Sequence, residues 1–166
     1  MELTADIPLK GEAWDCAVKE LGTIFSTRTN YSLFLLSCSI GIMYDQRIEK
    51  PAETTETEEH SVPRNVIHNN DNGKLDLMLQ AAVLSTRTVS LTEDERLEIA
   101  FGDSTDFNKR DFLVQFANYG VTKLVEQIGL TELETMENIK NFLCTSVEGR
   151  NFDIDSLPDE ILLMDE

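Results

Sequence analysis

The run from Tyr31 to Tyr44 constrains the fold more than any other feature, because it is apolar on nearly every side. Three serines are its main polar interruptions. A helix without a polar face belongs among other elements that cover it. The run is also shorter than the roughly 20 residues that cross a bilayer. It therefore predicts a helix in the middle of a bundle, and Gly41 predicts close packing or the start of the exit from that helix.

Other segments repeat apolar residues at helical spacings of three and four. They are residues 11–25, 74–86 and 106–128, and two helices opened by capping-box matches at Ser90–Glu93 and Thr131–Glu134. The apolar residues of the helix after Ser90 are Leu91, Leu97, Ile99, Ala100 and Phe101. No strand is required, although a small β-element at 62–67 or 86–91 stays open. The fold class is all-α, a single-domain bundle of five to seven helices.

Two further segments lack the pattern of a packed helix. Residues 45–73 contain Pro51, Pro63, Gly73 and a run of glutamates and threonines with no apolar period, so we expect a long surface loop that is partly disordered. Residues 150–166 mix acidic and apolar side chains. The predicted organisation is a helical domain over 1–149, with 45–73 as its long acidic loop, followed by an acidic-apolar tail over 150–166.

The charge of the chain excludes several partners. It has 31 acidic and 14 basic residues, a formal net charge of -17. Such a surface repels nucleic acid and anionic membranes, so we expect no direct contact with either. The N-terminal residues lack the basic start and apolar stretch of a signal peptide. The odd number of cysteines, Cys16, Cys38 and Cys144, fits buried free thiols in a reducing compartment. The expected location is the cytoplasm.

No residue pattern points to catalysis. The two histidines, His60 and His68, lie in the long loop, where a histidine without a placed partner is usually solvated. Short Cys/His spacings typical of zinc sites are absent from the sequence, as are phosphate-binding glycine loops. Residues 68–76 are rich in Asn and Asp but lack the full calcium-loop spacing, which favours a turn before a helix. We therefore expect a protein that is not an enzyme and that has no cofactor, catalytic or metal site.

The tail is the predicted partner-binding segment. Apolar side chains among acids are unfavourable in water, so they should dock on this domain or on another protein, and both outcomes stay open. The predicted contacts are Phe152, Asp153, Ile154, Asp155, Leu157, Asp159, Glu160, Ile161, Leu162 and Leu163.

Several short motifs follow one another in a familiar order. They are Phe25-Ser26-Thr27, Leu33-Phe34-Leu35-Leu36, Gly41, Val62-Pro63 and Phe116-Ala117-Asn118-Tyr119-Gly120-Val121. In this order, over about residues 14–128, the chain resembles the small accessory proteins of the bacterial DNA-phosphorothioation (Dnd system-associated) defence group. The family pattern has two glycines after the Asn, where this chain has Tyr119-Gly120. The resemblance implies a cytoplasmic bacterial helper in a phage-defence cluster, working beside larger ATPase or nuclease components, with no catalytic residues to carry over.

Asn118 and Gly120 also have a physical interpretation, since both interrupt the packed stripe of the 106–128 helix. A glycine there costs about 1 kcal/mol relative to alanine, which a close helix crossing would offset.

The leading hypothesis is a non-enzymatic acidic interaction module, an accessory subunit of an anti-phage defence or DNA-processing complex with a larger, basic partner. One alternative is a DNA mimic that inhibits a DNA-binding enzyme. Another is a metal-dependent enzyme that uses loop carboxylates.

Overall fold

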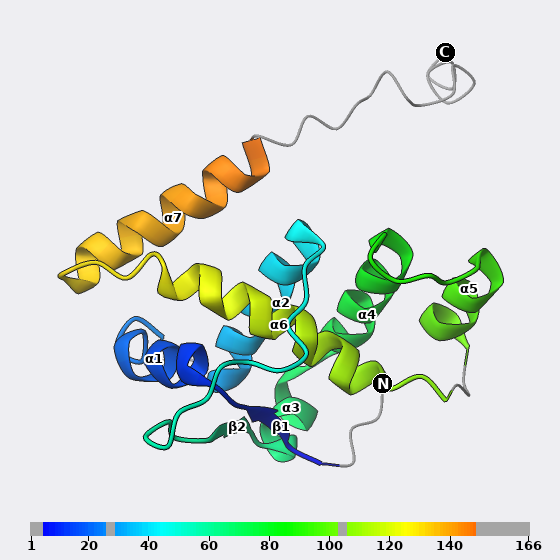
Figure 1. The fold of residues 1–166 in the computed structure, drawn as a ribbon, viewed down its shortest axis with the longest axis horizontal. Coiled ribbons are helices and arrows are strands. Elements are labelled where there is room, and N and C mark those ends of the chain that lie inside the picture. Colours follow the sequence, from blue (N-terminus) through cyan, green and yellow to red (C-terminus); the bar gives the residue numbers. More distant parts are fainter. Residues whose placement is uncertain (1–4, 26–28, 103–105, 149–166) are drawn as a thin grey trace. The chain divides into compact units, whose positions relative to one another are not determined.

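The computed structural model describes residues 5–25, 29–102 and 106–148, which form two compact units that divide between Ile128 and Gly129 (Figure 1). The first unit contains β1 (Ile7–Leu9), α1 (Glu12–Glu20), α2 (Asn30–Tyr44), β2 (His60–Val62), α3 (Arg64–Asn70), α4 (Lys74–Ser85), α5 (Glu93–Phe101) and α6 (Lys109–Val125). The second contains α7 (Glu132–Glu148). The all-α prediction is confirmed. The predicted boundary between the domain 1–149 and the tail lies at residues that the structure does not describe, so it stays a prediction.

Helices α2 and α6 cross at two glycines in the core of the first unit. A Cβ at Gly41 would overlap the backbone carbonyl of Phe116. A Cβ at Gly120 would overlap the backbone carbonyl of Ser37 in the same way. Each helix therefore presents a glycine to the main chain of the other, and the close crossing predicted from Gly120 is confirmed.

Helix α6 is the element that most others share. It contacts α1, α2, α4 and β1, and Figure 1 shows it extending from α1 on one side to α4 on the other. The largest fully buried side chains of the unit include Trp14, Phe34, Phe116, Ile40, Leu79, Leu113 and Leu124. Helix α2 is central as expected, but it is not covered on every side. Ser39 is exposed, and its hydroxyl donates to the carbonyl of Leu35 at 2.9 Å.

The segment 45–73 is not one long loop. The loop ends at residue 59, β2 begins at His60, and α3 follows it within the same segment. Strand β2 pairs antiparallel with β1, with Leu9 opposite His60 and Ile7 opposite Val62. Ile7, Leu9 and Val62 are buried, so the small sheet contributes to the core. The sequence offered no signal for β1, because three residues are too few to show an alternating pattern.

The loop 45–59 is held against the helices by its own backbone. The amide of Ile48 donates to the carbonyl of Gln115 at 3.0 Å. Further along, the carbonyl of Ala52 accepts from the amide of Glu12 at 2.8 Å. Arg47 lies over the rings of two phenylalanines of α6, at 5.3 Å and 5.8 Å from their centroids. These contacts place the loop over α6 first and then over the beginning of α1.

The Asn/Asp/Gly segment before α4 forms a turn, as predicted. Asn72 and Gly73 adopt the left-handed conformation with φ of 48° and 81°. Asp71 accepts hydrogen bonds from the amides of Gly73 and Leu75. The hydroxyl of Tyr31 donates to the same carboxylate at 2.5 Å. Asp71 therefore caps the first turn of α4 and joins it to the first turn of α2.

Helix α7 begins where its capping-box match placed it. The hydroxyl of Thr131 accepts from the amide of Glu134 at 3.2 Å, and the Glu134 carboxylate accepts from the amide of Leu130 at 2.8 Å. The amide of Gly129 donates to the hydroxyl of Thr135 at 2.9 Å. The Glu134 amide belongs to the first turn of the helix and has no partner within it, whereas the other two bonds fix the chain just before the helix.

Candidate functional site

The tail residues predicted as partner contacts lie within 149–166, outside the residues that the structure describes. They are Phe152, Asp153, Ile154, Asp155, Leu157, Asp159, Glu160, Ile161, Leu162 and Leu163. Their role therefore stays a prediction from the sequence, and candidate sites in the described residues come from other elements.

Helix α5 carries an exposed surface that combines large apolar groups with carboxylates. Residues four apart on a helix share a face, so Leu97 and Phe101 are neighbours on it. These two side chains are 47% and 61% exposed. What we call the α5 face consists of these two residues and three exposed acids: Glu93, Asp94, Leu97, Glu98 and Phe101. The sequence pattern places Leu97 and Phe101 among the apolar residues of this helix and does not show that they are exposed.

The only cation in α5 lies away from this face. The guanidinium of Arg96 donates to the carbonyl of Val83 on α4 and, at 3.2 Å, to the carbonyl of Val89. Ile99 and Ala100 are buried. The helix therefore packs through Arg96, Ile99 and Ala100, and the five residues of the α5 face include three carboxylates and no cation.

A capping box fixes the start of α5. Thr92 accepts from the amide of Glu95 at 3.3 Å, and the Glu95 carboxylate accepts from the amide and the hydroxyl of Thr92, both at 2.8 Å. The hydrogen bond from the backbone amide of Thr92 is the main reason why the pKa of the Glu95 carboxyl lies below its usual range. A capping box therefore opens α5, but Thr92 and Glu95 form it, so the Ser90–Glu93 match was wrong by two residues.

A second exposed apolar row lies on α4. Leu77, Ala81 and Leu84 are spaced by four and three residues, and the two leucines are 66% and 46% exposed. Within this row no acidic side chain alternates with the leucines, unlike the α5 face.

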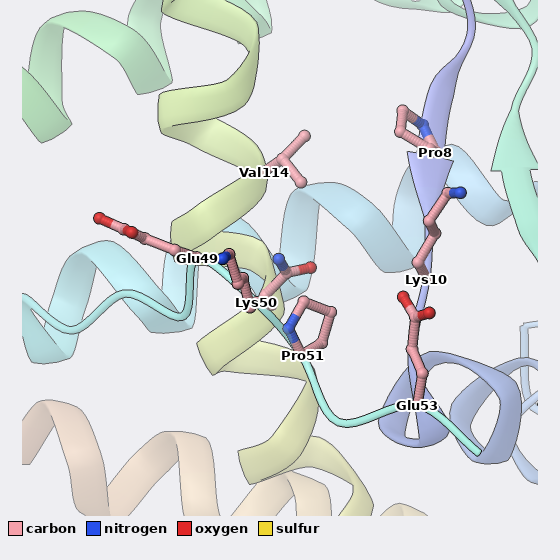
Figure 2. A pocket seen from close by; sticks show the side chains of 8 residues that line it. Pro8, Lys10, Glu49, Lys50, Pro51, Glu53 and Val114 are labelled. Atoms are coloured by element: carbon pink, nitrogen blue, oxygen red, sulfur yellow. The ribbon is translucent and has the colours of Figure 1, made fainter.

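A pocket of about 400 Å³ lies between β1, α6 and the loop 45–59. Figure 2 shows Pro8 of β1 and Lys10, which follows the strand, on one side and Val114 of α6 on the other, with Glu49, Lys50, Pro51 and Glu53 of the loop at the rim. Its rim carries two lysines and two glutamates, so the charges of the lining residues balance. Lys10 is also paired with Glu59 at 2.7 Å. This pocket therefore has mixed charge and a partly apolar wall.

Asn118 lines this pocket but is committed to a structural role. Its Oδ1 accepts from Nε1 of the buried Trp14 at 2.8 Å, and its Nδ2 donates to the carbonyl of Ile48 at 3.0 Å. It thereby joins α1, α6 and the loop. Since Asn118 is 5% exposed, both bonds are shielded from water. The polar residue that interrupts the apolar stripe is thus explained by a buried hydrogen-bond network.

His60 is not a solvated loop histidine, contrary to the expectation from the sequence. Its Nε2 lies 3.0 Å from Oδ1 of Asp15, and the two side chains are 17% and 15% exposed. Lys19 and the backbone amide of Glu58 also donate to this carboxylate, and these hydrogen bonds, led by that of His60, lower the pKa of Asp15. The site escaped sequence analysis because 45 residues separate Asp15 from His60. His68, by contrast, is exposed as expected.

The three cysteines differ in environment. Cys38 is buried, and burial raises its pKa to about 12, so it carries no thiolate near neutral pH. Burial and neighbouring carboxylates also raise the pKa of the half-buried Cys16. Cys144 on α7 is exposed, which contradicts the expectation that all three are buried.

No protein-family model, curated protein or solved structure matches this chain. None of the helices in the described residues combines the length and apolarity needed to cross a membrane.

Proposed function

We propose that this protein is an acidic interaction module that binds a basic amphipathic segment of a larger protein through the α5 face. The observation that supports it most is the exposure of Leu97 and Phe101 between Glu93, Asp94 and Glu98. Large apolar groups on a surface are typical of interaction sites, and aromatic residues often dominate binding energy.

Charge complementarity identifies the kind of partner. The net charge of -17 attracts a basic protein at long range and speeds the encounter. At short range the carboxylates of the α5 face can pair with Lys or Arg, while Leu97 and Phe101 contact the apolar side of the incoming helix. The expected setting in a bacterial anti-phage defence or DNA-processing complex depends on the sequence resemblance alone.

The first experiment uses a defined probe. A synthetic amphipathic helix of about 18 residues, with Leu on one side and Lys and Arg on the other, is titrated into the full chain while backbone amide resonances are followed. We expect shifts concentrated at residues 93–101. A scrambled peptide of the same composition, which keeps the charge but loses the apolar side, should bind at least tenfold more weakly.

Matched variants then locate the contact. Leu97→Ser with Phe101→Ser should weaken binding at least tenfold, whereas Leu77→Ser with Leu84→Ser on α4 removes equally exposed leucines and should leave it unchanged. If both double variants weaken peptide binding equally, or if the resonance shifts extend well beyond residues 93–101, the α5 face is not the binding site. For the DNA-mimic alternative, the discriminating result is direct competition between this chain and duplex DNA for a DNA-binding partner.

A further inference from the structure

The side chains of Asp15, Glu58 and His60 converge from three elements. Each offers one metal-ligating atom, and these atoms all lie within 4.8 Å of one another. Asp15 comes from the middle of α1, Glu58 from the end of the loop 45–59 and His60 from the start of β2. Two carboxylates and an imidazole are donors that Zn²⁺ accepts, and three protein ligands leave a fourth position for water.

A side-chain cation already occupies the space between the two carboxylates. Nζ of Lys19 lies 3.0 Å from Asp15 and 3.7 Å from Glu58. This shows that the cluster attracts positive charge at that point. The Lys19 side chain is 48% exposed, so it can turn towards solvent when another cation takes its place.

The backbone around the cluster is held on both sides. His60 is paired with Leu9 in the small sheet, and the loop is fixed to the start of α1 by the bond from the Glu12 amide to Ala52. Asp15 and His60 are thus nearly in place, with 3.0 Å between their facing atoms. Glu58, whose side chain is 66% exposed, is the ligand that has to move inward. Tetrahedral bonds of about 2 Å require donor atoms roughly 3.3 Å apart.

We propose that Asp15, Glu58 and His60 form a binding site for one divalent transition-metal ion of the Zn²⁺ class. The ion displaces the Lys19 ammonium and joins α1, the loop and β2. Because it binds the folded chain across three elements, it also raises the resistance of the fold to heat.

The test is calorimetric titration of ZnCl₂ into the chelator-treated full chain carrying Cys144→Ser, which removes an exposed thiol that could bind zinc. We expect one equivalent of Zn²⁺ bound and a higher melting temperature. His60→Ala and Asp15→Ala should each weaken binding at least tenfold. His68→Ala removes an exposed histidine of α3 outside the cluster and should leave Zn²⁺ binding unchanged.

Lys19→Met gives the most specific result, since removal of the competing ammonium should tighten Zn²⁺ binding several-fold. The ring nitrogens of His60, observed by NMR in the Cys144→Ser chain, should shift on ZnCl₂ addition, which tests the site even if a ligand variant fails to fold. The proposal is overturned if these nitrogens do not shift, if His68→Ala weakens binding as much as His60→Ala, or if Mg²⁺ binds as tightly as Zn²⁺.

Discussion

At the α2–α6 crossing, glycines let two backbones touch, and the surrounding side chains are buried and mostly apolar. Where α1, the loop and β2 meet, Asp15 accepts bonds from His60 and Lys19 in a half-exposed cluster. The crossing depends on close packing, so an added methyl group would overlap the backbone of the other helix. The cluster depends on charge and hydrogen bonds, which water can partly replace. The contrast suggests that the crossing sets stability, whereas the cluster is able to change its contacts and hence to bind a ligand.

The largest loss of stability is expected from Gly120→Ala, which tests the close packing at the crossing. Its Cβ would overlap the backbone of Ser37, so the helices have to separate, and we expect a loss of about 3 kcal/mol in the free energy of unfolding. Urea denaturation followed by circular dichroism measures it. Gly73→Ala is the control. Its Cβ meets nothing within 4 Å, and only its φ of 81° opposes alanine, which costs about 1 kcal/mol. Equal losses would mean that close packing is not what Gly120 supplies.

Asn118→Leu should have the next largest effect. It keeps the size of the side chain but leaves the Trp14 indole N–H and the Ile48 carbonyl without their partner. A buried group that loses its hydrogen bond costs about 1 to 3 kcal/mol, so we expect a loss of about 2 kcal/mol in urea denaturation. Hydrogen exchange should also quicken at the loop amides around Ile48. Unchanged exchange there would contradict the role of Asn118 in holding the loop.

Thr92→Ala tests a polar contact at the surface. It removes the hydroxyl of the α5 capping box, and the expected loss is about 1 kcal/mol. Amide exchange should increase in α5 and remain unchanged at the α2–α6 crossing. Loss of protection at both places would show that α5 and the core unfold together.

Asp15→Asn should give the smallest effect, and that effect should depend on pH. The pKa of Asp15 is lowered in the folded state, so its carboxylate stabilises the fold above the unfolded value of about 3.8, and this contribution is lost as pH falls through the folded pKa. The melting temperature of the variant should therefore lie below that of the native chain at pH 7. The difference should vanish in strong acid.

Glu56→Gln is the control for the loss of one charge, because Glu56 is an exposed loop residue outside the cluster. It should not reproduce the destabilisation at pH 7. If it does, the effect of Asp15→Asn reflects net charge and not the contact with His60.

Much of the helical framework could be predicted, because apolar spacing, capping residues and glycines act over one helix turn. The segment 74–86 differs from α4 by one residue at its end, and the run from Tyr31 to Tyr44 differs from α2 by one residue at its start. The small sheet and α3 could not be predicted. Three-residue strands show no period, and α3 is a seven-residue helix in a segment rich in asparagine.

The sequence by itself determined that this chain is acidic, largely helical and built around an apolar helix, because those properties follow from composition and from contacts between near neighbours. Only the tertiary structure decided that His60 meets Asp15, that Asn118 joins α1 to the loop, and that Leu97 and Phe101 remain exposed beside carboxylates. Each of these depends on which face of one element packs against another. Which face packs depends on how all the elements of the core fit together, and the spacing of residues along one element does not show it.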